Sequence, residues 1–280
     1  MKVVLANKIG PCFGVERAFK VALQAAKTPG PLTALGALVH HPEGIRRLEQ
    51  AGIRTVRKLE EIEEGRVIIS AHGVPPATIK QAKERGLDVV DATCPLVYLI
   101  HRTAREFHAS GRQVIILGDK EHREVRGIAG CIPHPVVIKG PQDVSALPDY
   151  QKVGLVSQST KRAETLAATT AALRKRYRDV AVAEYTICRP VRDRQLAIRD
   201  LAPLTDLIVI VGGKNSANTR EMVQAAQEHG ARVVHVEGAH ELDPESFRGA
   251  RTVGLAGGAS TPLETIHEVA HALEAMPPQA

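Results

Sequence analysis

Short apolar runs rich in Val and Ile recur along this 280-residue chain, and stretches of helical length separate them. Runs such as Val67–Ala71, Val114–Gly118 and Leu207–Gly212 contain almost no polar positions. Strands that are buried on both faces have this composition, and strands that are joined through helices pair in parallel. The alternation therefore predicts an α/β protein that is built on parallel sheets.

Helical periodicity fills the intervals between these runs. Apolar residues at i, i+3 and i+4 predict helices over residues 15–26 and 96–107. Thr261, Pro262 and Glu264 predict the start of a last helix, as N-cap, first helical residue and capping-box glutamate. The full set of predicted strands is Lys2–Ala6, Val67–Ala71, Asp88–Asp91, Val114–Gly118, Val136–Lys139, Val153–Ser157, Val180–Ala183, Leu207–Gly212, Val233–Val236 and Thr252–Ala256.

The chain has no linker or low-complexity stretch, yet it falls into thirds of similar composition. Each third contains strand–helix units, so we interpret residues 1–95, 96–190 and 191–280 as three small α/β domains. One or two larger doubly wound sheets are the alternative, because periodicity does not distinguish the two arrangements.

Composition restricts the class of protein. A content of 44% hydrophobic and 24% charged residues is that of a folded globular chain. With 3% aromatic residues and no Trp, the chain offers too few stacking faces for a groove that binds single-stranded nucleic acid. Its apolar runs are too short for a signal peptide or a membrane span. We therefore expect a cytoplasmic protein without nucleic-acid or membrane partners, whose net charge of +6 favours anionic ones.

Three of the four cysteines, Cys12, Cys94 and Cys188, follow predicted strand ends and precede predicted helices. A helix dipole favours a thiolate at that position, so the three could converge on a metal centre. The absence of CxxC pairs argues against a zinc ribbon, and three isolated thiolates suit a [4Fe–4S] cluster in which one iron lacks a protein ligand. A buried, inert thiol is the alternative for each cysteine alone, and it is our interpretation of Cys131.

Side chains suited to an anion also follow the predicted strands. Imidazole, hydroxyl and amide groups at helix starts bind phosphate without Lys or Arg, although many such residues only cap helices. The patterns of a P-loop and of a dinucleotide-binding turn are absent from the sequence. The candidates are His40, His72, His122, Ser159, Thr160, Ser216, Asn218 and Ser260.

Nine segments in order make the chain similar to the family of 4-hydroxy-3-methylbut-2-enyl diphosphate reductases, the last enzymes of the non-mevalonate isoprenoid pathway. The resemblance covers nearly all of the chain, and the stretch from Asp91 to Val97 is its most specific part. The segments span residues 6–15, 38–40, 70–74, 91–97, 122–125, 157–160, 187–188, 214–218 and 258–260.

This resemblance implies a trefoil of three α/β domains around a central [4Fe–4S] cluster that Cys12, Cys94 and Cys188 hold. It implies that Glu124 is the proton donor. It also assigns the substrate, mainly its diphosphate, to His40, His72, His122, Ser159, Thr160, Ser216, Ala217, Asn218 and Ser260. The sequence departs from the family where Ser159 replaces a common Thr and Ala217 replaces a common Ser.

The implied reaction is a reductive dehydroxylation that yields isopentenyl and dimethylallyl diphosphate. Its two electrons would come from an external carrier such as ferredoxin or flavodoxin, since no second cofactor motif is present. A three-cysteine, metal-dependent hydrolase of a phosphorylated small molecule, with Glu124 activating water, is the alternative. For Glu124 itself the alternative is an exposed residue at a helix start, paired with Arg123 or Arg126.

Overall fold

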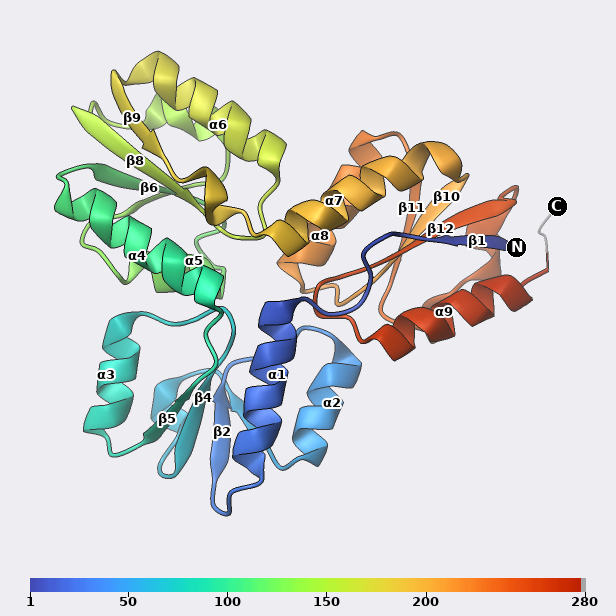
Figure 1. The fold of residues 1–280 in the computed structure, drawn as a ribbon, viewed down its shortest axis with the longest axis horizontal. Coiled ribbons are helices and arrows are strands. Elements are labelled where there is room, and N and C mark those ends of the chain that lie inside the picture. Colours follow the sequence, from blue (N-terminus) through green and yellow to red (C-terminus); the bar gives the residue numbers. More distant parts are fainter. Residues whose placement is uncertain (278–280) are drawn as a thin grey trace. The chain divides into compact units, whose positions relative to one another are not determined.

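The computed structural model describes residues 1–277. Within these residues the chain forms three four-stranded sheets, and every strand pairing in them is parallel (Figure 1). The predicted α/β class is confirmed, with three small sheets in place of one large one. No helix in the described part of the chain combines the length and the apolar character that a membrane crossing requires.

The strands are β1 (Lys2–Leu5), β2 (Leu32–Leu35), β3 (Arg54–Val56), β4 (Arg66–Ile69), β5 (Asp88–Asp91), β6 (Gln113–Leu117), β7 (Val136–Ile138), β8 (Lys152–Ser157), β9 (Asp179–Val182), β10 (Leu207–Val211), β11 (Arg232–Val236) and β12 (Thr252–Gly257). The helices are α1 (Phe13–Ala26), α2 (Pro42–Gln50), α3 (Pro76–Glu84), α4 (Pro95–Ala109), α5 (Arg123–Ala129), α6 (Ala163–Arg176), α7 (Arg189–Leu201), α8 (Ala217–Glu228) and α9 (Leu263–Ala275).

The chain divides into two compact units. Unit 1 consists of Met1–Glu16, Val39–Gln50 and the residues from Arg189 onward, and it contains the sheet β1-β12-β10-β11. Unit 2 consists of Arg17–Leu38 and Ala51–Cys188, and it contains the sheets β3-β2-β4-β5 and β7-β6-β8-β9.

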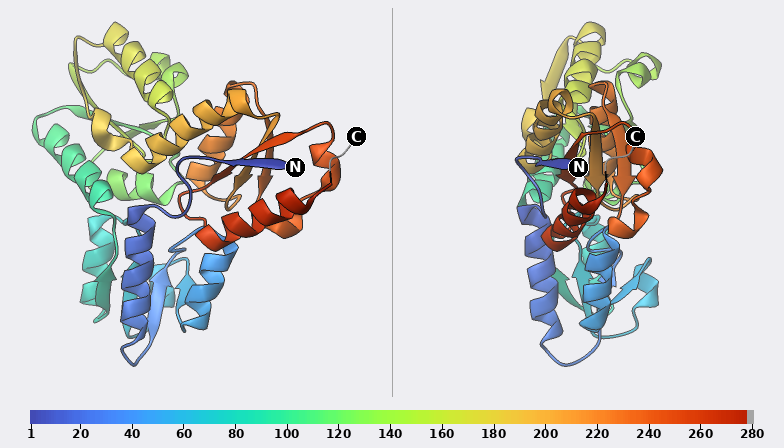
Figure 2. Two further views of the ribbon diagram at one scale, coloured as in Figure 1. Left: turned by 45° about the vertical axis from the view of Figure 1, so that its right-hand side comes forward. Right: turned by 90° about the vertical axis from the view of Figure 1, so that its right-hand side faces the viewer.

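Strand β1 lies in a sheet whose other members are distant in sequence. Lys2 pairs with Thr252 of β12, and both ribbon views show the dark blue strand beside the red one (Figures 1 and 2). Val3 packs against the apolar core that includes Val253 and Leu255, so burial of this strand requires the C-terminal part of the chain. The division at 95 and 190 stays a prediction, and residues 278–280 of the predicted third domain lie outside the described residues.

Alternation along β10 produces the two faces of the sheet in unit 1. Val209 and Val211 pack on the face that α9 covers, whereas Ile208 and Ile210 pack against residues of α7 and α8 (Figure 1). All residues of β10 are buried. A central strand of this kind can only be apolar, which explains the uninterrupted LIVIV run.

The sheet β7-β6-β8-β9 of unit 2 follows the same rule. Ile115 and Leu117 of β6 pack with residues of α6, while Val114 and Ile116 pack with residues of α4 and α5. In the sheet β3-β2-β4-β5, a further core joins Val67 of β4 to Ala82 of α3. Both faces of β6 are therefore buried, and all residues of β2 and Val67–Ile69 of β4 are buried as well.

Two strands, β2 and β3, were absent from the sequence-based prediction. β3 is three residues long, and Arg54 and Thr55 are exposed, so it carries little of the apolar signal. β2 is fully buried but follows the segment Pro29-Gly30-Pro31, which is typical of a loop. β2 pairs with β4 and β3 pairs with β2, so both strands depend on partners that their own sequences do not reveal.

The predicted capping box at the start of α9 was wrong. The helix begins at Leu263, Pro262 is its N-cap, and no side chain caps it. The Thr261 hydroxyl instead donates a hydrogen bond of 2.9 Å to the Val211 carbonyl at the end of β10. Thr261 is fully buried, so its hydroxyl takes the backbone acceptor that the sheet places beside it.

Candidate active site

Glu124 lies in the first turn of α5 and is buried, with 1% of its surface exposed. Its carboxylate accepts two hydrogen bonds from Ser159, one from the backbone N–H at 2.5 Å and one from Oγ at 2.7 Å. Burial raises the pKa of Glu124 to about 7, although the two hydrogen bonds act to lower it. This carboxyl group can therefore hold a proton near neutral pH, as a general acid must.

The exposed, Arg-paired interpretation of Glu124 is wrong. Arg123 donates to the Leu35 carbonyl at 2.8 Å, and Arg126 forms an ion pair with Glu121. Both arginines thus bind groups other than Glu124, and Glu124 itself is buried. The stabilising partner of its carboxylate is Ser159.

Arg123 connects the start of α5 to the end of β2. Gly36 follows β2 with φ +74°, and a Cβ atom on it would lie 1.4 Å from Nη1 of Arg123. Only glycine leaves room there for the guanidinium group, whose pKa burial lowers. Arg123 thereby holds the helix that carries Glu124 against the sheet β3-β2-β4-β5.

His72 and His122 lie together in unit 2. Their ring centroids are 5.4 Å apart with an interplanar angle of 81°. His122 is the N-cap of α5, and its Nδ1 accepts a hydrogen bond of 3.3 Å from the backbone N–H of Glu124. Nδ1 of His72 lies 3.4 Å from Oγ of Ser70. Two of the predicted substrate-binding imidazoles thus lie close to each other, and one is bonded to the residue predicted as the acid.

The two predicted ligands in unit 2 both lie at starts of helices. Cys94 is the N-cap of α4, and its backbone N–H donates to the Ala71 carbonyl at 3.0 Å. Cys188 directly precedes α7, and its backbone N–H donates to the Ser159 carbonyl at 3.1 Å. Ser159 therefore links the backbone of a predicted ligand to the carboxyl group of Glu124.

Gln158 was missed by the sequence analysis and organises the same loop. It is 2% exposed; its Oε1 accepts from the Asp119 N–H at 3.1 Å, and its Nε2 donates to Oγ1 of Thr160 at 2.7 Å. Thr160 does not begin a helix, because α6 starts only at Ala163. The signal that could have identified Gln158 is its place between the strand end Ser157 and the candidate Ser159.

Unit 1 contains the remaining candidates. Cys12 directly precedes α1, and its backbone N–H donates to the Ala259 carbonyl at 2.9 Å. Ser216 is the N-cap of α8, and its Oγ accepts from the Thr219 N–H at 3.3 Å. Ala217 is the first residue of this helix, so its own N–H has no acceptor within the helix.

Two buried polar atoms in unit 1, Oδ1 of Asn218 and Oγ of Ser260, have no hydrogen-bond partner within residues 1–277. The amide nitrogen of Asn218 reaches only the sulfur of Met222, at 3.4 Å. An unpaired buried polar atom costs about 1–3 kcal/mol, so a polar ligand that reached these two atoms would gain binding free energy.

Cys131 differs from the other three cysteines. Cys131 lies in the turn after α5, and its Sγ donates to the carbonyl of Gly127 within that helix, at 3.3 Å. Burial raises the pKa of this thiol, which disfavours the thiolate that a metal binds. These features suit a small, inert core residue.

No group of three or more His, Cys, Asp or Glu side chains within residues 1–277 is arranged to hold a metal ion. Cys94 and Cys188 belong to unit 2, whereas Cys12 belongs to unit 1. Neither unit by itself contains the three predicted thiol ligands.

Comparison with protein families classifies the chain. Residues 3–274 match the family model described as LytB protein. The chain belongs to the LytB family. The family resemblance read from the motifs is therefore confirmed, and the α/β class agrees with it.

Relatives of this LytB chain share one name. A 4-hydroxy-3-methylbut-2-enyl diphosphate reductase of Geobacter sulfurreducens is 38% identical over 270 residues, which are 96% of this chain and 95% of the relative. The protein of the same name from Aquifex aeolicus is 36% identical over 273 residues, 95% of this chain and 94% of the relative. Similarity extends over both chains at nearly full length.

Two solved structures are also similar to this LytB protein. The E-1-hydroxy-2-methyl-but-2-enyl-4-diphosphate reductase of Plasmodium falciparum has a TM-score of 0.94 at 26% identity, covering 99% of this chain and 89% of the other. An (E)-4-hydroxy-3-methyl-but-2-enyl diphosphate reductase, titled the terminal enzyme of the non-mevalonate pathway, has a TM-score of 0.70 at 35% identity and covers 98% and 99%.

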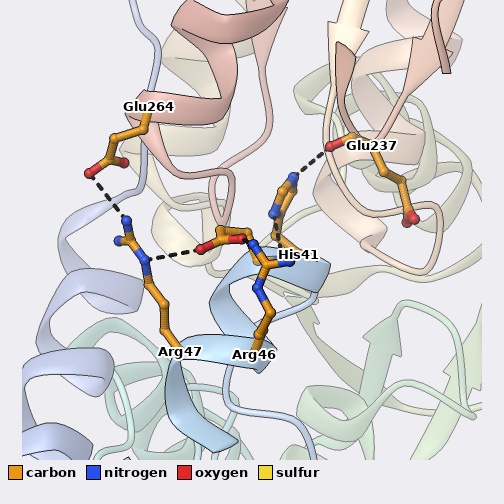
Figure 3. A network of polar contacts seen from close by, with 6 residues as sticks. His41, Arg46, Arg47, Glu237 and Glu264 are labelled. Atoms are coloured by element: carbon orange, nitrogen blue, oxygen red, sulfur yellow. Dashed lines mark hydrogen bonds and ion pairs between the residues drawn. The ribbon is translucent and has the colours of Figure 1, made fainter. Parts of the chain in front are cut away.

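A polar network in unit 1 of the LytB chain also escaped the sequence analysis (Figure 3). His41, the neighbour of candidate His40, is 2% exposed and reaches the Glu237 carbonyl at 2.8 Å. Glu43 forms ion pairs with Arg46 and Arg47. The sequence signal for His41 was its position between His40 and Pro42, and the structure adds its contact with the Glu237 carbonyl.

Proposed function

We propose that this LytB protein reduces 4-hydroxy-3-methylbut-2-enyl diphosphate to isopentenyl diphosphate and dimethylallyl diphosphate. The names of its relatives supply the substrate. The structural observation that supports the chemistry is the buried Glu124 with a pKa of about 7, because the departing hydroxyl must be protonated. Two electrons and two protons convert the allylic alcohol into an alkene and water.

Glu124 supplies the first of these protons. Its protonated carboxyl donates to the departing oxygen, the C–O bond breaks, and the oxygen leaves as water. The resulting carboxylate is stabilised by the N–H and the hydroxyl of Ser159, which already point at its two oxygens. The two electrons remain on the three-carbon allyl group that cleavage of the C–O bond leaves. The second proton adds to one or the other end of this allyl group, and the end that receives it decides which product forms.

We assign the diphosphate to neutral donors and imidazoles. The N-terminus of α8 presents the N–H of Ala217, where the helix dipole favours an anion. The unpartnered atoms of Asn218 and Ser260 support polar ligand binding in the same unit. The full proposed set is His40, His72, His122, Ser159, Thr160, Ser216, Ala217, Asn218 and Ser260.

We propose Cys12, Cys94 and Cys188 as the ligands of a [4Fe–4S] cluster. The donor set fits such a cluster, because each thiol directly precedes a helix, where the dipole favours its thiolate. When bound, the cluster supplies the two electrons and, at the iron without a protein ligand, a Lewis acid for the substrate hydroxyl.

We further propose a cytoplasmic location and an external electron donor. A reducing compartment keeps the three thiols available for metal binding. A small acidic carrier such as ferredoxin or flavodoxin suits a chain with a net charge of +6, because opposite charges accelerate encounter.

The decisive test is turnover by anaerobically purified protein. With substrate and dithionite, we expect both products by NMR from a brown protein that contains about four iron and four sulfide ions. A colourless zinc protein that releases phosphate would instead support the hydrolase. A brown protein that does not consume the substrate would also exclude our proposal.

A further inference from the structure

Glu237 accepts hydrogen bonds from two segments of unit 1 that contain proposed substrate-binding residues. Its side-chain Oε1 accepts a hydrogen bond of 2.7 Å from the backbone N–H of Lys214, just before the Ser216–Asn218 segment. Its backbone carbonyl accepts from His41 at 2.8 Å, next to His40 (Figure 3). One residue after the end of β11 thus contacts both segments.

Both ring nitrogens of His41 are used. Nδ1 accepts from the backbone N–H of Glu43 at 3.3 Å, so Nε2 must carry the proton that Glu237 receives. Burial lowers the pKa of His41, which favours this neutral form. The ring therefore caps the start of α2 and joins it to the end of β11.

The two segments also touch directly. A Cβ atom on Gly213 would lie 2.1 Å from the carbonyl oxygen of His40, so only glycine permits this approach. The backbone of His40 and the turn before Ser216 are consequently packed against each other, and a shift in one requires a shift in the other.

Lys214 is held through its side chain as well. Its Nζ donates to Oε1 of Glu241 at 2.7 Å, and Oε2 of Glu241 accepts from the Glu237 N–H at 2.9 Å. Lys214 is therefore held by Glu237 through its backbone and by Glu241 through its side chain.

We propose that Glu237 and His41 are positioning residues that together hold His40 and the Ser216–Asn218 segment in the arrangement that binds diphosphate. This inference rests on the proposed function of those two segments. Neither Glu237 nor His41 takes part in the chemistry, so their loss should weaken binding of the substrate and leave the cluster and kcat near the wild-type values.

The test separates the two contacts. Glu237→Ala removes the acceptor for Lys214 but keeps the backbone carbonyl, and we expect KM to rise about tenfold, the size of one lost charge-assisted hydrogen bond. Glu237→Gln retains a side-chain oxygen acceptor and should recover most of the loss. Glu245→Ala, which removes an exposed carboxylate paired with Arg248, is the matched control and should leave KM unchanged.

His41→Leu removes both ring contacts and should also raise KM about tenfold. His41→Gln keeps an N–H donor for Glu237 and should lie between wild type and Leu. Combined with Glu237→Ala, His41→Leu should raise KM by less than the product of the two single effects, because both act on one assembly.

Binding of inorganic diphosphate, measured by calorimetry in parallel, makes the result independent of turnover. Weaker binding by Glu237→Ala and His41→Leu supports the proposal. An unchanged KM and an unchanged diphosphate affinity in either variant, even with a lowered melting temperature, would overturn it. If the wild type binds diphosphate but does not reduce the substrate, the proposed function fails while the positioning role stands.

Discussion

The surroundings of Glu124 in unit 2 and of Asn218 in unit 1 differ in how their polar atoms are satisfied. Both oxygens of the buried Glu124 carboxylate are bonded to Ser159. Asn218 and Ser260 instead each bury a polar atom that has no partner among residues 1–277. Both oxygens of the acid are thus bonded within the protein, whereas the Asn218 Oδ1 acceptor and the Ser260 hydroxyl are not.

This difference follows from the tasks we propose for the two regions. A general acid needs a pKa near the working pH, and burial in a rigid environment sets it. A site for an anion needs donors that the protein has not already used, which costs some stability in the absence of the ligand. The effects expected from this contrast are given below from the largest to the smallest, beginning with the proposed cluster ligands.

Replacement of the proposed ligands should have the largest effect. Cys12→Ser, Cys94→Ser and Cys188→Ser should each reduce iron and sulfide content and abolish activity, because each removes one of three protein ligands. Cys131→Ser is the matched control and should retain the cluster, since its thiol is bonded to the Gly127 carbonyl. Bleaching by Cys131→Ser, with a stable cluster in any of the other three, would refute the ligand assignment.

Glu124→Gln tests the organised acid directly. The amide keeps the shape and can still accept from Ser159, but it cannot donate a carboxyl proton. We expect an intact cluster, normal substrate binding and a loss in kcat of about 10²- to 10⁴-fold. A kcat within about threefold of wild type, measured under the same reductant, would move the proton source to another group, such as His122 or the substrate's diphosphate.

The pH profile should report the same residue. Because burial raises the pKa of Glu124 to about 7, the carboxyl is protonated below that pH and ionised above it. The kcat of the wild type should therefore fall as the pH rises above 7, and that of Glu124→Gln should not show this fall.

Ser159→Ala should move the fall in kcat to higher pH. The hydroxyl of Ser159 donates to the carboxylate and lowers the pKa of Glu124, so its removal should raise that pKa further. Ser159→Thr keeps the hydroxyl and is the control. A fall at lower pH in Ser159→Ala would contradict the contact as described.

Changes in unit 1 should act on binding and should be the smallest. Asn218→Ala should weaken substrate binding by up to about 1–3 kcal/mol if the amide contacts a phosphate oxygen. Ala217→Ser, which adds a hydroxyl at the first residue of α8, should change the affinity only slightly. Equal affinity of the wild type for the diphosphate substrate and its dephosphorylated alcohol, by calorimetry, would reject the assignment of these residues.

Much of the architecture follows from local pattern. Strand and helix periods predicted the α/β class, and positions after strand ends singled out Cys12, Cys94 and Cys188 without any knowledge of contacts. The strands β2 and β3 were missed because one is short and partly exposed and the other follows a turn-like segment. The capping box failed because Thr261 has a better acceptor across the sheet than along its own helix.

By itself, the sequence determined the α/β class and ten of the twelve strands in residues 1–277, because these depend on periodicities of two and 3.6 residues along the chain. Only the tertiary structure decided that β1 pairs with β12, that Arg123 occupies the space beside Gly36, and that Ser159 binds Glu124. Pairing, burial and the resulting pKa depend on groups distant in sequence, and desolvation exists only once the chain has closed around the carboxyl group.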